Sequence, residues 1–455
     1  MARLVIVSNR VASLKESGPM AGGLTVSLQE AVKRREMLWF GWSGECSDRR
    51  EPRISSSGDR THALIDLTPH DHRLYYTGFC NGMLWPLLHY RFGLAQFRRA
   101  EEEGWRAVNR RFAEQLMPLL REDDTIWIHD FHLFPLAAAL RDLGVRQKIG
   151  FFLHVPFPPP ALFAALPRAA ALLTDLQAID LIGTQTAEDA EHLSAAMRQY
   201  GVNTPVGVFP VGIHAEAFAR AAESAAARKD AQRFKESLTG RRLIFGVDRL
   251  DYSKGLPQRV LGFADLLKRY PQHRGKVTFL QAAPVSRGEV AQYRMLRREM
   301  DELVGRINGE YAEVDWVPLR WTTRPIPRRT LAGFLRMANI ALVTPLRDGM
   351  NLVAKEFVAA QSPEDPGVLI LSQFAGAARE MEGAVKVNPN DPDEIAEALD
   401  LAINMPIAER RERWRMDYDK LVEAGASGWS RAFLASLNRA EFSPNGSAEG
   451  EGAGK

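Results

Sequence analysis

The sequence predicts an α/β protein with two Rossmann-like, doubly wound domains that face a cleft. Short apolar runs alternate with longer amphipathic stretches along the chain, which is the pattern of parallel sheets built from βαβ units. The chain has 455 residues, enough for two or three domains. A charged, alanine-rich stretch at residues 215–238 separates an earlier series of predicted strands from a later one.

The predicted strands form two series. The first series lies at residues 4–8, 38–42, 63–67, 125–129, 149–154, 181–185 and 206–210. The second series lies at residues 243–248, 277–281, 314–318, 340–345, 368–372 and 384–387. Helical periodicity fills the intervals, as at residues 24–35, 105–120 and 187–200. Each series is long enough for a sheet of its own, and such sheets bind ligands beyond the carboxyl ends of their strands.

We place the domain boundary directly after the alanine-rich stretch. The first domain then covers residues 1–238 and the second covers residues 239–424. A helix at about residues 425–442 is expected to pack back on the first domain. Residues 443–455 are rich in Gly, Ser and Glu and contain no large apolar side chain, so we expect a disordered tail there.

The composition excludes several classes of protein. Hydrophobic residues make up 45% and charged residues 25%, which is typical of a soluble globular chain. Lys and Arg total 59 against 56 for Asp and Glu, a net charge of +3 without a basic stripe, so no nucleic-acid partner is expected. The two cysteines, Cys46 and Cys80, can form neither a disulfide framework nor a zinc knuckle. No signal peptide or membrane span is evident, so we expect a cytoplasmic protein.

Two loops of the first domain are candidates for phosphate contact. The loop after the first predicted strand reads SNR, which places Arg10 just beyond the carboxyl end of that strand. Gly22 and Gly23 then open the following helix. Glycines at a helix N-terminus expose backbone N–H groups and let a phosphate approach closely. Two adjacent glycines are weak evidence for phosphate contact, and a simple turn is their more usual explanation.

The second series of strands carries a pair of cations in one loop. Arg249 and Lys254 follow the predicted strand 243–248 and precede a helix. An arginine that forms a bidentate fork and a lysine that acts as a point charge can together clamp a diphosphate. The alternative is a surface loop with local Asp–Arg pairing.

A second loop of this domain follows the predicted strand 340–345. Gly349 and Met350 would open a helix whose free N–H groups face the anionic end of a ligand. Asp348 and Glu356 can accept hydrogen bonds from sugar hydroxyls. Alternatively, Asp348 is an ordinary helix cap and Glu356 a solvated helix residue.

Histidines are confined to the first part of the chain, at or before His273. The clusters at residues 70–72 and 129–132 superficially suggest metal sites, but alternation on a strand points neighbouring side chains to opposite faces, so no metal is expected. His154 ends an apolar strand and meets the proline-rich loop 155–160, at the edge where ligands bind. A core histidine that is bonded to a carbonyl is the alternative.

Aromatic side chains cluster in the first domain. Tyr75, Tyr76 and Trp85 lie close together in the sequence, and Trp39 and Trp42 precede them. Flat apolar faces with polar edges suit sugar rings, and a tyrosine hydroxyl can bind a phosphate. Core packing is the usual explanation for any one of these residues.

Taken together, these segments resemble the trehalose-6-phosphate synthase family of retaining glycosyltransferases, which have the two-domain GT-B architecture. The matching stretches run in the family's order from residue 8 to about residue 378. They are SNR with AGGL, WFGWSGE, NGMLWPLLHY, WIHDFHL, HVPFPPP, DLIGTQT, VFPVGI, GVDRLDYSKG, AAPVSRGEV, GRINGEY, TPLRDGMNLVAKEFVAAQ and LSQFAGAA. The chain departs from the family's pattern at Pro159, Ala161 and Thr184.

The resemblance implies a role for particular residues. It implies a pocket for a phosphorylated acceptor sugar, lined by Arg10, Trp39, Tyr76, Trp85, Asp130 and Arg287. It implies a nucleotide-sugar donor site made of Gly22, Gly23, Arg249, Lys254, Asp348, Gly349, Met350, Asn351, Leu352 and Glu356. It places four residues next to the reacting atoms, namely His154, Asp348, Arg249 and Lys254.

The function that the resemblance implies is the transfer of glucose from a nucleotide diphosphate glucose, UDP-glucose in first place, to glucose 6-phosphate. It also implies retention by a front-face route. The sequence itself offers no convincing paired carboxylates for a double displacement. No cofactor is expected, and the implied partners are small-molecule substrates and further copies of the chain in a homo-oligomer.

Three alternatives remain open at this point. A related transferase could use glycerol 3-phosphate or a cyclitol phosphate as its acceptor, and a phosphorylase or epimerase could share the fold. A non-catalytic sugar-phosphate sensor is disfavoured because the implied donor residues are all present.

Overall fold

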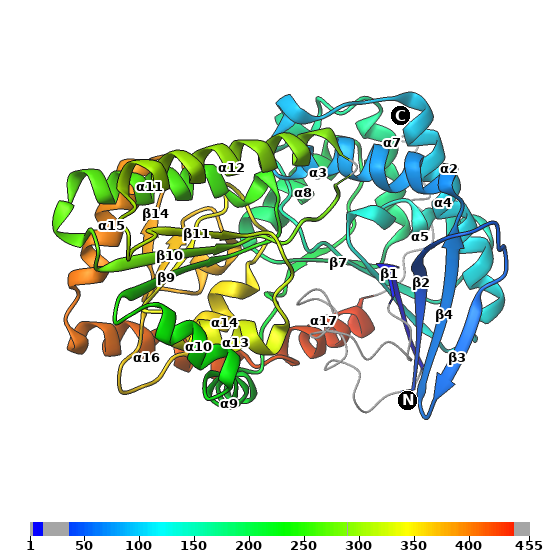
Figure 1. The fold of residues 1–455 in the computed structure, drawn as a ribbon. Coiled ribbons are helices and arrows are strands. Elements are labelled where there is room, and N and C mark those ends of the chain that lie inside the picture. The colour runs from blue at the N-terminus through cyan, green and yellow to red at the C-terminus, as the bar shows by residue number, and fades with distance from the viewer. Residues whose placement is uncertain (1–2, 12–35, 289, 441–455) are drawn as a thin grey trace, which may run out of the picture.

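The computed structural model describes residues 3–11, 36–288 and 290–440. Within these residues the chain forms two sheets that lie side by side (Figure 1). The strand order is β3-β4-β2-β1-β5-β6-β7-β8 in the first sheet and β11-β10-β9-β12-β13-β14 in the second. Neighbouring strands are parallel except for the antiparallel pair β3 and β4. The predicted fold class, α/β with two doubly wound sheets, is confirmed.

The strands and helices have the following bounds. The first sheet consists of β1 (Leu4–Arg10), β2 (Met37–Cys46), β3 (Arg53–Ser57), β4 (Arg60–Leu67), β5 (Thr125–His129), β6 (Lys148–Phe152), β7 (Leu181–Thr184) and β8 (Val206–Val208). The second consists of β9 (Arg242–Val247), β10 (Val277–Ala282), β11 (Leu319–Thr322), β12 (Ile340–Val343), β13 (Val368–Ser372) and β14 (Val385–Val387). The α-helices are α2 (Pro69–Asp71), α3 (Trp85–Leu88), α4 (Arg99–Leu116), α5 (Leu136–Asp142), α6 (Pro160–Phe163), α7 (Ala169–Asp175), α8 (Ala187–Arg198), α9 (Ala215–Ala226), α10 (Lys229–Ser237), α11 (Leu256–Arg269), α12 (Ala291–Tyr311), α13 (Arg328–Met337), α14 (Leu352–Ala360), α15 (Pro392–Asn404), α16 (Ile407–Ala424) and α17 (Gly428–Arg439).

Both faces of each sheet are buried under helices, because successive side chains of a strand point to opposite faces. In β1, Val5 and Val7 belong to the core that α4 and α5 cover. Leu4 and Ile6 of the same strand point to the other face, where α17 packs. The near-continuous apolar runs of the sequence therefore match strands that are covered on both sides.

Tyr75 and Tyr76 of the aromatic cluster lie on an unusual helix. Residues His72–Leu84 form a π-helix, η1, which runs directly into the short helix α3. The backbone N–H of Trp85 bonds to the carbonyl of Cys80, five residues earlier. Such wide turns are rare and are often found at functional sites.

Two predicted elements need correction. Residues 314–318 were expected to form a strand, but Val314 lies fully exposed in a turn, and the strand β11 begins only at Leu319. The strand β3 was not predicted, because its sequence RISSS lacks an apolar face and lies mostly exposed at the edge of the sheet. The predicted helix at residues 24–35 lies outside the described residues.

The alanine-rich stretch lies on the second sheet. It forms α9 and α10, which were expected on the first domain's side of a boundary after residue 238. Ala222 and Ala225 are buried in the core that α13 and α14 share. A Cβ at Gly333 of α13 would meet the backbone of Ala225, so these two helices cross closely where both side chains are small. The packing therefore divides the chain before α9 rather than after α10.

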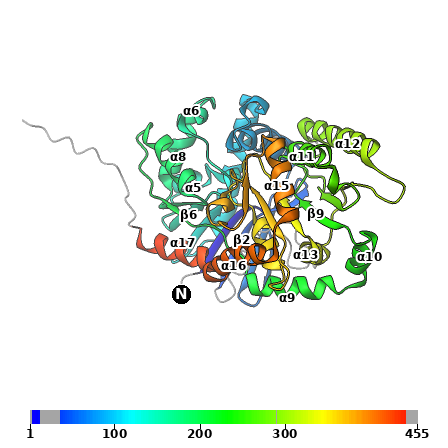
Figure 2. The same cartoon turned by 90° about the vertical axis from the view of Figure 1, so that its left-hand side faces the viewer.

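The chain crosses twice between the two halves. The first crossing follows β8, and the second lies between α16 and α17. The crossings touch, because a Cβ at Gly212 would collide with the carbonyl oxygen of Gly425. Beyond the second crossing, α17 packs on β6 and β7 of the first sheet, as Figures 1 and 2 show.

Candidate active site

Several side chains that the sequence singled out follow the carboxyl ends of the central strands. In the first sheet, β1 ends at Arg10, β5 is followed by Asp130, and β6 leads to His154. In the second sheet, the loop after β9 carries Arg249 and the loop after β12 carries Asp348. Open α/β sheets bind their ligands at these ends.

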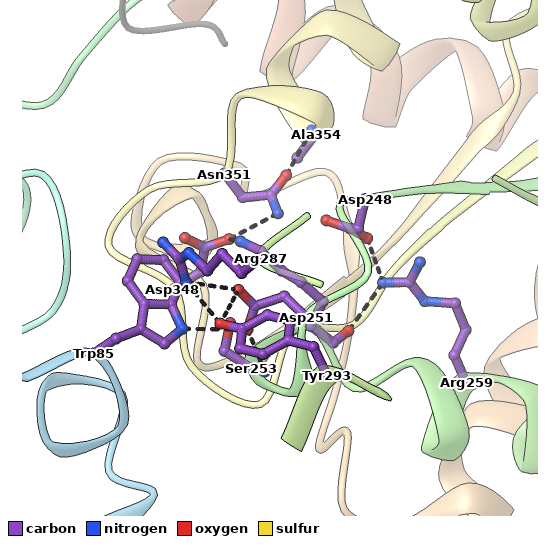
Figure 3. A network of polar contacts seen from close by, with 11 residues as sticks. Trp85, Asp248, Asp251, Ser253, Arg259, Arg287, Tyr293, Asp348, Asn351 and Ala354 are labelled. Carbon is purple, nitrogen blue, oxygen red and sulfur yellow. Dashed lines mark hydrogen bonds and ion pairs between the residues drawn. The ribbon is translucent and has the colours of Figure 1, made fainter. Parts of the chain in front are cut away.

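Trp85 joins the two halves of the site (Figure 3). Its indole N–H donates to Asp251 Oδ1 at 3.3 Å. The Arg287 guanidinium lies over the Trp85 ring, 3.9 Å from the ring centroid. The same guanidinium donates to the Tyr293 hydroxyl at 2.7 Å and to Asp251 Oδ2 at 3.3 Å. Arg287 and Trp85, which the resemblance places at one phosphate, are thus in contact.

The charge of Asp251 is fixed by its neighbours. Burial raises the pKa of this carboxyl group, but the guanidinium groups of Arg287 and Arg249 outweigh burial and lower the pKa to about 2. Its Oδ1 atom also accepts from the backbone N–H and hydroxyl of Ser253, which lies in the turn Tyr252–Lys254. Asp251 is therefore an anchor that holds Arg287 and the cationic loop together.

Arg249 and Lys254 lie in very different environments. Arg249 is exposed, and its guanidinium lies 5.5 Å from the centroid of the Trp85 ring. It forms no ion pair with another described residue, so the local Asp–Arg pairing considered above is not observed. Lys254 is buried, and its Nζ lies 2.5 Å from Asp348 Oδ2. Burial raises the pKa of Asp348, but Lys254 outweighs burial and lowers it.

The turn before α14 brings the two halves of the molecule into direct contact. Asn351 has a φ of 88° and caps α14, because its side chain accepts from the N–H of Ala354 at 3.1 Å. Its amide also donates to Asp348 at 3.0 Å, so Asp348 is not the helix cap. Gly349 lies against the backbone of His154, and a Cβ at position 349 would collide with the His154 carbonyl oxygen. Only glycine fits there.

The remaining residues of this loop and helix are largely shielded from solvent. Met350 belongs to the core of the second domain, and Leu352 packs partly buried against the core of the first. Glu356 is 9% exposed and accepts from Arg328 at 3.3 Å. Burial raises the pKa of Glu356 and Arg328 only partly offsets this, so the alternative of a solvated helix residue is wrong.

His154 and Asp130 meet on the first domain's side. The N–H of His154 donates to Asp130 Oδ1 at 3.3 Å, and Asp130 adopts a φ of 75°. Burial raises the pKa of Asp130 to about 6. Burial also lowers the pKa of His154 to about 3, so this imidazole is neutral. Its ring nitrogens contact His129 and Gln185, not a backbone carbonyl.

The structure places the other predicted acceptor residues as follows. Arg10 is exposed, with its guanidinium against Gly44. Tyr76 is half-buried and stacks on His132, with ring centroids 6.1 Å apart. Trp39 is 2% exposed, packs in the core, and donates its indole N–H to Ser8 at 2.8 Å. Trp39 thus lies beneath the end of β1.

Two further predictions concern glycines and metals. Gly22 and Gly23 lie outside the described residues. Among the residues that the structure describes, no three His, Cys, Asp or Glu side chains form a group that could hold a metal ion. Over the same residues, no helix combines the length and apolarity needed to cross a bilayer.

The sequence matches a known family over nearly all of its length. The model of glycosyltransferase family 20 covers residues 4–439. The chain belongs to this family. A trehalose-6-phosphate synthase of Sinorhizobium fredii is 46% identical to the glycosyltransferase, over 96% of this chain and 98% of the relative. The recognition of the trehalose-6-phosphate synthase family is therefore confirmed.

Solved structures match the glycosyltransferase equally well. An α,α-trehalose-phosphate synthase (UDP-forming) from Burkholderia xenovorans in complex with glucose-6-phosphate is 44% identical, with a TM-score of 0.93 over 96% of this chain and 100% of that chain. A structure described as trehalose-6-phosphate from E. coli bound with UDP-2-fluoro glucose is 43% identical, with a TM-score of 0.91 over 96% of this chain and 99% of that chain. Both support the two-domain fold.

The glycosyltransferase also has a charged contact between its halves that the sequence reasoning missed. We call it the interdomain seam and define it as Tyr90 and Glu188 from the first half with Arg347 and Arg379 from the second. Arg347 donates to Glu188 at 2.6 Å and to the Tyr90 hydroxyl at 2.9 Å. Arg379 donates to the other Glu188 oxygen at 3.0 Å. Burial raises the pKa of Glu188, but Arg347 and Arg379 outweigh burial and lower it.

Other residues of the glycosyltransferase site were also missed. Asp251 stands inside the stretch GVDRLDYSKG, but only the cations of that stretch were singled out. Tyr293 lies on α12, outside every matching stretch, and the sequence carries no local signal for it. Both act through Arg287, so they become visible only when the fold brings their elements together.

Proposed function

We propose that this glycosyltransferase transfers glucose from UDP-glucose to glucose 6-phosphate, with retention of configuration, and forms α,α-trehalose 6-phosphate and UDP. The observation that carries the proposal is the convergence of Arg249 and Arg287 on Trp85, beside Lys254 and Asp348. Cations from two loops thus face one place between the sheets. The names and bound molecules of the relatives described above agree with two anionic substrates.

The acceptor side of the proposal rests on the aromatic π-helix and the cations next to it. Arg287 over Trp85 offers a desolvated guanidinium, which binds phosphate through a bidentate fork. Tyr76 lies on this π-helix and stacks on His132, with ring centroids 6.1 Å apart. Asp130 is the group proposed to accept a hydrogen bond from an acceptor hydroxyl.

The donor side of the proposal rests on Arg249, Lys254 and the turn before α14. We propose that the bond between C1 of glucose and the β-phosphate oxygen breaks while the acceptor hydroxyl oxygen bonds to C1 on the same face. The hydroxyl proton passes to the departing phosphate oxygen. The protein positions both substrates and offsets the charge that builds on the diphosphate. Glu356 is proposed to bind the ribose.

The reaction is proposed to need no cofactor, because Arg249 and Lys254 supply the positive charge at the diphosphate. We expect turnover to persist after treatment with EDTA. A strict requirement for an added divalent cation would contradict this part of the proposal.

Product identification tests the proposed function. The protein is incubated with UDP-glucose and glucose 6-phosphate, and the products are separated and analysed by NMR. We expect a non-reducing disaccharide phosphate whose two anomeric couplings are both α. The same incubation with ADP-glucose or GDP-glucose, and with glycerol 3-phosphate as the acceptor, measures the choice of substrates. Absence of the disaccharide phosphate with every donor would refute the proposal.

A further inference from the structure

A chain of hydrogen bonds runs from the first crossing between the halves to His154. The backbone N–H of Val211 donates to Gln185 Oε1 at 3.0 Å. Gln185 Nε2 then lies 3.5 Å from His154 Nδ1. His154 Nε2 lies 3.0 Å from His129 Nδ1. The donor and acceptor in each of these contacts depend on which nitrogen carries the proton. The first hydrogen bond of the series, from Val211, fixes these proton positions.

The N–H group of Val211 determines which partner donates in each hydrogen bond of the series. A backbone N–H can only donate, so the oxygen of the Gln185 amide must face Val211 and its NH₂ group must face His154. An NH₂ group can only donate, so His154 Nδ1 accepts. A neutral imidazole carries one proton, which His154 therefore holds on Nε2 and donates to His129 Nδ1.

The peptide group of Val211 is held from both sides. Its carbonyl oxygen accepts from Lys355 Nζ at 2.7 Å, and Lys355 is a buried residue of α14 in the second domain. Gln185 is 4% exposed, so water does not compete for its amide. The donor that orients the chain is thus fixed by both halves of the molecule.

His129 is the last residue of this series of hydrogen bonds. With its Nδ1 accepting, its proton lies on Nε2, and this buried atom has no hydrogen-bond partner among the described residues. Burial lowers the pKa of His129 well below its ordinary value, which keeps the ring neutral. The rings of Phe152 and Trp429 pack around the two histidines, with centroids 4.6 Å and 6.1 Å from that of His154.

We propose that Gln185 and His129 are positioning residues that hold His154 as the neutral Nε2–H tautomer. Both ring nitrogens of His154 are then engaged by the protein, Nδ1 as the acceptor from Gln185 and Nε2–H as the donor to His129, so the ring neither donates nor takes a proton in the reaction. This inference rests on the proposed function at one point only, namely that the transferred sugar lies beside His154. The tautomer itself follows from the contacts alone.

NMR of the full-length protein with ¹⁵N-labelled histidine tests the tautomer directly. The His154 signals are assigned by their loss in His154→Asn. We expect a pyridine-type Nδ1 and a pyrrole-type Nε2 for His154, without change between about pH 6 and pH 8, where a free histidine titrates. A pyrrole-type Nδ1, or an imidazolium in this range, would overturn the proposal.

Gln185→Glu provides the decisive variant. A carboxylate can only accept, so His154 must then carry a proton on Nδ1, and we expect the NMR signature to change accordingly. The altered ring should lower kcat on the order of 10²-fold, the size expected for a misplaced group, while KM for glucose 6-phosphate stays within about twofold. Gln199→Glu adds the same charge at an exposed position of the first domain and serves as the control. An unchanged His154 tautomer in Gln185→Glu, at a pH where the new carboxyl group is ionised, would contradict the inference.

A second pair of variants covers the case in which Gln185→Glu does not fold. His129→Asn keeps an acceptor oxygen near the place of Nδ1, whereas His129→Leu has none. We expect His129→Asn to keep the Nε2–H tautomer of His154 and to lose less kcat than His129→Leu. Equal losses in both, with the tautomer altered in both, would count against the role of His129.

The two proposals fail separately. If wild-type protein shows the expected tautomer but forms no disaccharide phosphate, the proposed function is wrong and the hydrogen-bond chain stands. If the disaccharide phosphate forms and His154 carries its proton on Nδ1, the hydrogen-bond chain is wrong and the proposed function stands.

Discussion

At the scale of single residues, Arg249 and Lys254 show how one loop holds two cations in different ways. Lys254 is buried and already bound to Asp348, so it keeps the turn before α14 in place as well as supplying charge. Arg249 is exposed and lies over the edge of Trp85, where it can turn toward an arriving anion. The two substitutions should therefore differ in their effect on stability.

We expect Arg249→Ala and Lys254→Ala each to lower kcat by about 10²-fold or more, because each removes a cation from the site proposed for the departing diphosphate. Arg249→Ala should leave the urea unfolding curve unchanged, whereas Lys254→Ala should shift it to lower urea because Asp348 loses its counter-charge. Arg298→Ala removes an exposed arginine from α12 and is the control. Steady-state kinetics and urea titrations measure both effects, and near-normal turnover in both variants would refute the assignment.

Asp130 is a largely buried carboxyl group to which we assign a role in acceptor binding. Its pKa in the folded chain is about 6, above the ordinary value for a carboxyl group, because burial disfavours the charged form. Between about pH 4 and pH 6 the folded chain keeps a proton that the unfolded chain releases, so the contribution of Asp130 to stability falls as pH rises through this window.

We expect Asp130→Asn to stabilise the protein at pH 7.5 by up to about 3 kcal/mol, because no buried charge remains. The gain should vanish near pH 4, where the wild-type carboxyl is protonated. Turnover should fall at the same time, since the proposed partner of an acceptor hydroxyl is lost. Urea unfolding at the two pH values measures the effect, with the exposed Asp142→Asn as the control. A stability difference that does not depend on pH would contradict the assignment.

At the scale of elements, the turn before α14 is the most constrained. Gly349 touches the backbone of His154, and a neighbouring glycine, Gly376, would collide with the Gly349 carbonyl if it carried a Cβ. The turn is thus packed from both sides by backbone, which cannot move aside as a flexible side chain can. Its position relative to the first sheet follows from this contact.

We expect Gly349→Ala to raise KM for the donor and to lower kcat, because the added Cβ pushes the turn away from His154. The matched control is Gly309→Ala in α12, where an added Cβ meets nothing within 4 Å and the helix gains up to about 1 kcal/mol. Kinetics and thermal unfolding of both variants make the comparison. If both alanines are tolerated alike, the close contact has no functional role.

The sequence predicted elements best where a strand runs straight into the site. Strands β9 and β12 were predicted with their loops, so Arg249, Lys254 and Asp348 were found as candidates. The failures have physical reasons. Residues 314–318 are apolar enough for a strand, yet Val314 is fully exposed, because β11 pairs with β10 further along the chain. Alanine-rich helices give no local sign of which neighbour they pack on.

At the scale of the whole molecule, the site depends on contacts between distant residues. Trp85 and Asp251 are 166 positions apart, and Lys254 and Asp348 are 94 apart. Patterns in a single sequence identify such residues one by one but do not pair them. The seam between the halves has the same property, since Glu188 is an ordinary first-turn residue of α8 until Arg347 reaches it.

We expect Glu188→Ala to weaken closure of the two halves, because Arg347 and Arg379 lose their common partner. KM for the donor should rise about fivefold, in line with the loss of about 1 kcal/mol from a partly buried ion pair. Glu191→Ala, an exposed residue of the same helix, is the control. Kinetics and small-angle X-ray scattering report on affinity and closure. Unchanged values for both would show that the seam does not hold the halves together.

Finally, the position of α17 constrains the order in which the protein can be built on the ribosome. Trp429, Phe433 and Leu437 fill the face of the first sheet that Leu4 and Ile6 share, and each contributes about 1.5–3 kcal/mol by burial. Domains usually fold in the order in which they are synthesised. Here one face of the first sheet stays uncovered until α17 has emerged, after every strand of the second sheet has been synthesised, so the final packing of the first sheet is a late event.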